Sequence, residues 1–411
     1  MGRGFLKGLL PPKSKPLDIS NPMVSPSLGA KLTRKQLDEY VPKPQPYYIF
    51  SGSRWQRVNP PATGPVPGPG ADDKAGITNL RLLTWNIDFM APFPQARMAA
   101  ALAYLQTVVE GVPEPSTTAV VICLQELRQD MPIDLDRPVS AGRFDPQIAD
   151  DLRQVAAAAW VQGRFLVSDL ATDHWRCGYN CVTLVDRRLG CAGASRLPFV
   201  SEYRREALLV DIPVAPRAAS PSPSSPSSSS SPGEKQQQQT VGSVLRICNV
   251  HLDSMAGKPP MRPIQWKACA KYLQRASDGV AGGILAGDCN ANQGYDLTQA
   301  EENGFTDAYL ETGGEEGDPR GHTWGPQSKS SRFPHKRMDK VCFCQPGRGG
   351  GDGQQLLNLK SLEKIGVGVK IGDESISAKL AEEGWLDFVT DHYGLMADFE
   401  IGEAWILGVE A

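Results

Sequence analysis

Residues 80–86 read Leu-Arg-Leu-Leu-Thr-Trp-Asn, an apolar run that ends in a polar amide. The length and composition of Leu80–Trp85 within it predict a buried β-strand. An amphipathic pattern over residues 95–109 predicts a helix with one apolar stripe, and residues 119–124 form a second apolar run. The order strand, helix, strand predicts a βαβ unit.

The later apolar runs combine further βαβ order with strands that follow one another directly. This mixture fits a purely parallel, doubly wound sheet poorly, and it favours two mixed β-sheets packed face to face with helices outside, in one α/β domain. Strands are expected near 164–167, 179–185, 207–212, 244–250, 283–287, 338–344 and 396–400, and helices over 263–275 and from Asp145-Pro146 onward, with Ile148, Leu152, Val155 and Ala159 on one face.

A basic tail precedes this domain. Residues 1–75 are rich in Pro, Gly, Lys and Ser, carry 11 Lys/Arg against 5 Asp/Glu, and are expected to be mostly disordered. Within the tail, Tyr47–Phe50 and Trp55 could add a short strand to the domain, which spans 76–405. A low-complexity Ser/Pro/Gln insertion at 213–240 lies where a hairpin loop is expected. The charge of the tail allows contact with nucleic acid, although a solubilising role fits it better.

Hydropathy and cysteine content limit the class of protein. No apolar run has the length of a transmembrane helix, and the N-terminus lacks a secretory signal pattern. The nine cysteines show no paired Cys-x-x-Cys spacing, which predicts a reduced protein without structural zinc. We therefore expect an intracellular monomer without membrane contact, in the nucleus, the cytoplasm or both.

Five short polar motifs follow or end apolar strands. Carboxylates and amides at strand ends can project into a shared cleft and together hold a hard cation. A single Gly-Asp-x-Asn is more often a β-turn, but five such motifs together indicate a Mg²⁺-dependent phosphodiester site, with Mn²⁺ as a substitute ion. The motifs are Thr84-Trp85-Asn86, Leu124-Gln125-Glu126, Gly287-Asp288-Cys289-Asn290, Arg337-Met338-Asp339 and Thr390-Asp391-His392.

With the stretches GYNCVTLVDRRL (178–189), VHLDS (250–254) and HTW (322–324), these motifs resemble the endonuclease/exonuclease/phosphatase superfamily over about 80–401. The resemblance implies a four-layer α/β sandwich and a Mg²⁺-dependent phosphoesterase. It implies that Glu126 is the principal Mg²⁺ ligand, with Asn86 in the hydration shell of the ion and Asp391 in the same polar cluster.

The resemblance also implies catalytic roles. Asp288 would activate or orient the attacking water, and Asn290 would hold this nucleophile and a phosphate oxygen. His392 would stabilise the charge that develops on the phosphorus centre, and Asp339 would orient its ring. Tyr179 would approach the phosphate.

Other residues bear on the substrate. His251 is similar to a histidine found in the tyrosyl-DNA phosphodiesterase, sphingomyelinase, deadenylase and DNase I-like branches; otherwise it is a core histidine at a strand end. Arg205 is either a contact for the substrate backbone or an ordinary surface arginine, and Trp324 is a further candidate substrate contact. The resemblance also implies a phosphate-binding arginine shortly after Asn290, and this sequence has none there. A cation of the neighbouring loop could replace it, and the candidates are Arg320, Lys329, Arg332, Lys336 and Arg337.

The expected function is hydrolysis at DNA 5′ ends, with removal of 5′-tyrosyl (topoisomerase) adducts in DNA repair, and the expected partners are DNA ends or protein–DNA adducts. A nuclease, a deadenylase or a sphingomyelinase-like enzyme of the same fold is the alternative. A non-catalytic binding module is a third possibility, which the filled set of metal and base positions disfavours.

Overall fold

The computed structural model describes residues 40–59, 76–130, 150–217, 243–257, 260–329, 332–345 and 355–408. The greater part of the basic tail, the Ser/Pro/Gln stretches at 220–239, the Asp145-Pro146 start with Ile148, and the glycine-rich loop at 347–353 lie outside these residues. In the described part of the chain, no helix combines the length and apolar character that a membrane span requires.

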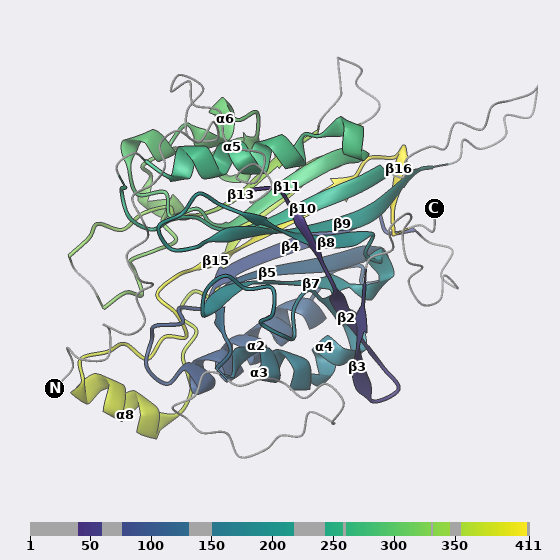
Figure 1. The fold of residues 1–411 in the computed structure, drawn as a ribbon. Coiled ribbons are helices and arrows are strands. Elements are labelled where there is room, and N and C mark those ends of the chain that lie inside the picture. Colours follow the sequence, from purple (N-terminus) through teal and green to yellow (C-terminus); the bar gives the residue numbers. More distant parts are fainter. Residues whose placement is uncertain are drawn as a thin grey trace, which may run out of the picture.

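Two mixed β-sheets pack face to face, as Figure 1 shows, which confirms the expected fold class. Within the first sheet β10 and β11 are parallel, and the other neighbouring strands are antiparallel. The strands are β1 (Lys43–Gln45), β8 (Gly193–Pro198), β9 (Glu206–Pro216), β10 (Ser243–His251), β11 (Val280–Asp288), β13 (Asp339–Cys344) and β12 (Thr306–Asp307) in spatial order, with β16 (Trp405–Leu407) paired to β9.

The second sheet repeats this plan. Its one parallel pair among the described strands is β4 and β5. The spatial order is β14 (Leu357–Ile365), β15 (Gly394–Ile401), β4 (Asn79–Asn86), β5 (Thr118–Arg128), β7 (Tyr179–Asp186), β6 (Phe165–Val167), β2 (Tyr47–Ser51) and β3 (Arg54–Val58).

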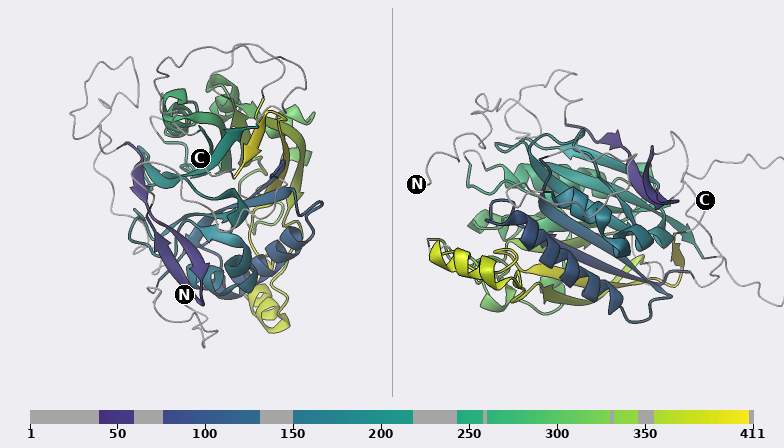
Figure 2. Two further views of the ribbon diagram at one scale, coloured as in Figure 1. Left: turned by 90° about the vertical axis from the view of Figure 1, so that its right-hand side faces the viewer. Right: turned by 90° about the horizontal axis from the view of Figure 1, so that it is seen from below.

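Helices cover the outer faces of both sheets, which gives four layers (Figures 1 and 2). The helix α2 crosses from β4 to β5 and α5 crosses from β10 to β11, so each parallel pair is a βαβ unit. The helices are α2 (Pro94–Glu110), α3 (Asp151–Ala157), α4 (Ala159–Arg164), α5 (Arg262–Leu273), α6 (Gln299–Glu302), α7 (Ala308–Glu311) and α8 (Glu374–Glu382).

The central strands are buried on both faces, because alternate side chains enter different apolar layers. In β4, Leu80 and Leu82 join the core between the sheets, whereas Leu83 and Trp85 pack beneath α2. In β10, Ile247 faces the core between the sheets and Val250 belongs to the layer under α5. Continuous apolar runs therefore mark these strands in the sequence.

The expected strand at Tyr47–Phe50 and Trp55 is present as the antiparallel pair β2 and β3. β2 extends the second sheet beside β6, and β1 extends the first sheet beside β8. At the other expected boundary, β9 continues to Pro216, so residues 213–216 are strand rather than insertion. β9 and β10 are antiparallel neighbours, and the insertion falls in the sequence between them.

Candidate active site

The five polar motifs meet at one end of the sandwich because of the strand directions. The parallel pair of the first sheet ends at His251 and Asp288, which are register partners, and Asp339 begins the antiparallel strand beside Asp288. In the second sheet, β4 ends at Asn86, opposite Gln125. The carboxyl ends of both parallel pairs thus bring their side chains to a common centre.

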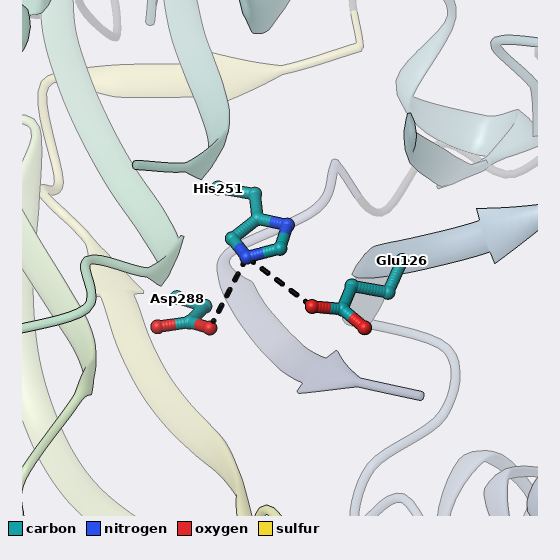
Figure 3. A group of neighbouring side chains, drawn as sticks. All are labelled: Glu126, His251 and Asp288. Carbon is teal, nitrogen blue, oxygen red and sulfur yellow. Dashed lines mark ion pairs between the residues drawn. The ribbon is translucent and has the colours of Figure 1, made fainter. Parts of the chain in front are cut away.

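A carboxylate–histidine cluster spans the two sheets at this centre (Figure 3). The Nε2 atom of His251 lies 3.3 Å from Oε1 of Glu126 and 3.4 Å from Oδ2 of Asp288. The ligand atoms of the three residues all lie within 4.8 Å of one another. Burial, followed by the nearby Arg205 cation, lowers the pKa of His251 well below its usual value. His251 is therefore a neutral imidazole facing two acids.

The donor chemistry of this cluster fits a divalent cation. Burial raises the pKa of Glu126, and the charges of Asp288 and Asp391 raise it further, although Arg205 and His392 oppose them. Carboxyl groups that crowd together in a buried site gain stability when a cation neutralises them. Asp391 approaches the same centre, with Oδ1 3.8 Å from Nε2 of His392.

Asp288 is fixed by donors from two neighbouring segments. Its Oδ2 accepts a hydrogen bond from Nδ2 of Asn86 at 2.9 Å, and its Oδ1 accepts one from the backbone N–H of Asn290 at 2.8 Å. The Asn290 side chain donates to the carbonyl oxygen of Leu252 at 2.9 Å. The three predicted residues Asn86, Asp288 and Asn290 are thus together.

A second cluster joins Asp288 to an Asp–His pair. The Nδ1 atom of His392 lies 2.8 Å from Oδ2 of Asp339, and its Nε2 atom lies 3.8 Å from Oδ2 of Asp288. Burial alone would lower the pKa of His392, but the charges of Asp339 and Asp288 raise it well above its usual value. His392 is therefore cationic, in contrast to neutral His251.

Tyr179 and Arg205 also lie near His251, whose ring centroid is 6.2 Å from that of Tyr179. The Arg205 side chain donates to the hydroxyl of Tyr179 at 3.2 Å and to the carbonyl of Leu252 at 2.9 Å, and its guanidinium lies 5.5 Å from the Tyr179 ring centroid. Only 6% of Arg205 is exposed, so it is not an ordinary surface arginine. Phe89 stacks on Tyr179 with the ring centroids 3.9 Å apart.

Trp324 lies beside the acidic centre. Its indole nitrogen donates to Oδ2 of Asp391 at 2.7 Å, and its backbone bridges to that of His392. The indole N–H is therefore occupied in orienting Asp391, so a contact between Trp324 and a substrate would use the ring.

The five candidates for the missing arginine fall in different environments. Arg337 is buried and forms ion pairs with Asp307 and Glu316, so it cannot serve as the replacement. Arg320 pairs with Asp318 on the surface. The Lys336 backbone pairs with that of Trp324. Lys329 and Arg332 line a pocket that reaches Asp391.

The backbone is strained where the site is built. Glu126 has a φ of 63°, at a register shift between Leu124 and Leu127, and Asn290 has a φ of 48°. Left-handed backbone is unfavourable for such residues and persists where surrounding structure imposes it. The bulge turns Glu126 out of the strand alternation and toward His251.

Several residues of this centre were not predicted from the sequence. Asp88 contributes a further carboxyl group, whose pKa is raised well above its usual value by burial and by the charges of Asp391 and Glu126. Between the sheets, the Gln125 side chain donates to Oδ1 of Asn249 at 2.8 Å and to Oγ1 of Thr84 at 3.0 Å. Polar residues inside otherwise apolar strands were the available signal for this network.

The fold and the site define a two-sheet α/β sandwich with a carboxylate–histidine centre at one end. Comparisons with models of protein families and with curated protein sequences give no match. Among solved structures, the chain is similar to TDP2 from Caenorhabditis elegans, at 17% identity over 78% of this chain and 75% of that chain, with a TM-score of 0.49.

Two further similar structures have the same extent of overlap with this chain. TDP2 from Danio rerio, complexed with a single-strand DNA product, is 14% identical over 78% of this chain and 99% of that chain, with a TM-score of 0.48. An endonuclease/exonuclease/phosphatase family protein from Leptotrichia buccalis is 14% identical over 78% and 100%, with a TM-score of 0.45.

Proposed function

We propose that this chain is a Mg²⁺-dependent phosphodiesterase that hydrolyses phosphodiester bonds at DNA 5′ ends and removes 5′-tyrosyl adducts. The observation that carries the proposal is the position of Asp288, whose carboxylate belongs to both the Glu126–His251 cluster and the Asp339–His392 cluster. One acid is thereby shared between a candidate cation site and a charged histidine, and both of these groups can stabilise negative charge on a phosphate.

Glu126 would hold the Mg²⁺, with Asp391 and Asn86 beside it. The bound ion would supply neutralisation of the phosphate charge. Oxygen donors dominate this group, in agreement with the preference of Mg²⁺ for hard ligands.

The other residues would accept the proton of the attacking water and stabilise the negative charge that develops on the phosphorane. Asp288 would orient the attacking water and accept its proton, since its two oxygens are held by Asn86 and Asn290. His392 would present its cationic ring to the phosphorane oxygens. Asp339 would keep that ring in place, because its Oδ2 lies 2.8 Å from Nδ1 of His392.

A substrate panel tests the proposal. We expect the wild-type protein with Mg²⁺ to release tyrosine from a 5′-tyrosyl oligonucleotide and to act weakly on abasic DNA, poly(A) and sphingomyelin. Asp288→Ala and Glu126→Gln should abolish the release, whereas Glu400→Gln, a half-exposed acid on β15, is the matched control. Efficient cleavage of poly(A) or sphingomyelin without turnover of the tyrosyl substrate would refute the assignment.

Titration calorimetry separates an enzyme from a binding module. We expect Mg²⁺ to bind the wild-type protein measurably and to bind the Glu126→Gln variant at least roughly tenfold more weakly, because one ligand charge is lost. If Mg²⁺ produces no heat with the wild-type protein, the centre is not a metal site.

A further inference from the structure

A group of basic side chains lies beside the candidate active site and outside its two carboxylate–histidine clusters. This cationic surface consists of His322, His335, Lys336 and Lys364. Burial lowers the pKa of His322, and the charges of the other three residues lower it further. These charges act on His322 because the four side chains lie close together. The rings of His322 and His335 have their centroids 6.2 Å apart.

Backbone pairing connects the cationic surface to the candidate active site. Trp324 forms one backbone bridge with Lys336 and another with His392. In addition, the N–H of Tyr393 donates to the carbonyl oxygen of Thr323 at 2.7 Å. The segment that contains Trp324 therefore lies between Lys336 and His392. A ligand that covered the cationic surface would thus be next to the phosphate site.

The lysine at position 364 reaches this surface from the edge strand β14. Its register partner in β15 is Leu395, two residues after Tyr393. The Lys364 ammonium lies 5.2 Å from the centroid of the Tyr393 ring. One face of this ring is therefore covered by a cation.

The positive charge of the surface is not balanced by the described part of the chain. Among the residues that the structure describes, no acid forms an ion pair with any of the four basic side chains. Asp318 is near enough to raise the pKa values of His322 and Lys364, but its carboxylate is bound by Arg320 at 2.6 Å. Since unbalanced like charges repel, a bound anion would stabilise this group.

The arrangement suits the phosphates of a nucleic acid better than its bases. Surfaces that bind unpaired bases offer aromatic faces for stacking, whereas Lys364 already covers one face of Tyr393. A double helix presents mainly its phosphates, and basic side chains pair with them whatever the sequence. His335 and Lys364 are exposed and His322 and Lys336 are half-buried, so all four can contact such a backbone.

We propose that the cationic surface binds the phosphate backbone of double-stranded DNA next to the 5′ end in the active site. Lys336 and Lys364 would pair with phosphates, and His322 and His335 would donate hydrogen bonds to them. This proposal rests on the proposed function for the position of the 5′ end. It specifies that the end belongs to a duplex.

Fluorescence anisotropy with a 5′-phosphorylated hairpin duplex tests the surface, because this DNA carries no adduct and binding is measured without turnover. Lys336→Ala/Lys364→Ala should weaken binding roughly tenfold and lower the slope of log K against log [salt] by about 2, since two phosphate contacts are lost. A single strand of the same sequence should lose less than about threefold.

Two further variants separate the contacts from general effects of the substitutions. Lys336→Arg/Lys364→Arg keeps both charges and should bind the duplex as the wild type does. Lys360→Ala/Lys379→Ala removes the same charge from exposed positions on β14 and α8, and it is the matched control. This control should change the affinity for the duplex by less than about threefold.

Several results would overturn the proposal. If the single strand and the duplex lost equally, the cations would hold the scissile strand alone. If the control lost as much as Lys336→Ala/Lys364→Ala, the effect would come from net charge. Unchanged affinity for the duplex, or no duplex binding by the wild type, would also refute it. A protein that binds the duplex as expected but releases no tyrosine from the 5′-tyrosyl oligonucleotide would retain this surface and lose the proposed activity, so the two proposals fail separately.

Discussion

The Nδ1 atom of His392 lies 2.8 Å from Oδ2 of Asp339, and the two residues come from segments on different sheets. The contact fixes the ring with Nε2 directed toward Asp288 and Asp391, 3.8 Å from an oxygen of each. It also helps to keep His392 cationic, since the charge of Asp339 raises its pKa.

Asp339→Asn should lower kcat by roughly 10²–10⁴-fold with a small change in KM, because the ring loses its orientation and its charge partner. The pKa of His392 should fall, so activity that needs its cationic form would be lost at a lower pH than in the wild type. A pH–rate profile with the 5′-tyrosyl oligonucleotide measures both effects. Asp278→Asn, on the surface, is the control. If the pH–rate profile of Asp339→Asn matched that of the wild type, Asp339 would not orient His392 or keep it cationic.

Asn249→Ala should destabilise the protein by roughly 2–4 kcal/mol, because it breaks the polar link between the sheets. The Asn249 side chain donates to the carbonyls of Val182 and Leu124, and it accepts from Gln125. Urea unfolding measures the loss, with Asn358→Ala on the edge strand β14 as control. A loss no greater than that of the control would show that the link does not hold the sheets together.

Gly287→Ala should cost more than about 3 kcal/mol or prevent folding. Gly287 has a φ of 144°, and an added Cβ would lie 2.0 Å from the carbonyl oxygen of Val250 on the neighbouring strand. Gly163→Ala in α4, where a Cβ meets nothing within 4 Å, should instead be neutral or stabilising by about 0.5–1 kcal/mol. Thermal unfolding of both variants measures the difference between the two substitutions. Equal Tm values for Gly287→Ala and Gly163→Ala would disprove it.

Asp151→Asn should stabilise the protein at pH 8 and have little effect at pH 4. Burial raises the pKa of Asp151 to about 7, against a hydrogen bond from the Arg128 N–H that lowers it. The folded state therefore binds the proton more tightly than the unfolded chain, and this contribution to stability is lost as the pH rises from about 4 to 7.

The gain from Asp151→Asn at pH 8 could reach about 4 kcal/mol, the free-energy equivalent of that pKa difference. Urea unfolding of the variant and the wild type at both pH values measures it. An equal difference in stability at pH 4 and pH 8 would contradict the titration of Asp151 in this range.

The central strands were predictable from sequence because both of their faces are buried. β4 and β11 carry continuous apolar runs, and the expected ranges agree with the structure to within a few residues. β8, β14 and α8 were not predicted. β14 alternates buried with half-exposed residues at a sheet edge, and α8 buries Leu380 alone among its residues, so neither carries a strong apolar pattern.

The chemical motifs could also be recognised, because each lies next to a predictable strand: three end or follow one, and those of Asp339 and His392 lie at the start of β13 and just before β15. Their mutual geometry was not, since it depends on how the two sheets face each other. Arg337 illustrates the difference: its place in the loop region near the site made it a candidate phosphate contact, but its side chain lies in a buried ion network with Asp307 and Lys340. Asp88 was missed because its role depends on neighbours as distant in sequence as Asp391.

The strands β1 and β2 have a consequence for how the chain can be shortened. The two strands follow each other directly in the sequence, but they belong to different sheets. β1 pairs with β8 in the first sheet, and β2 pairs with β6 in the second. Removing residues up to Gly76 would leave two rows of unpaired backbone N–H and C=O groups facing solvent, which invite pairing between molecules. The segment at 43–58 thus makes β1 and β3 the outermost strands in place of β8 and β6, and we expect a shortened chain to aggregate more readily than the full chain while its candidate active-site residues are intact.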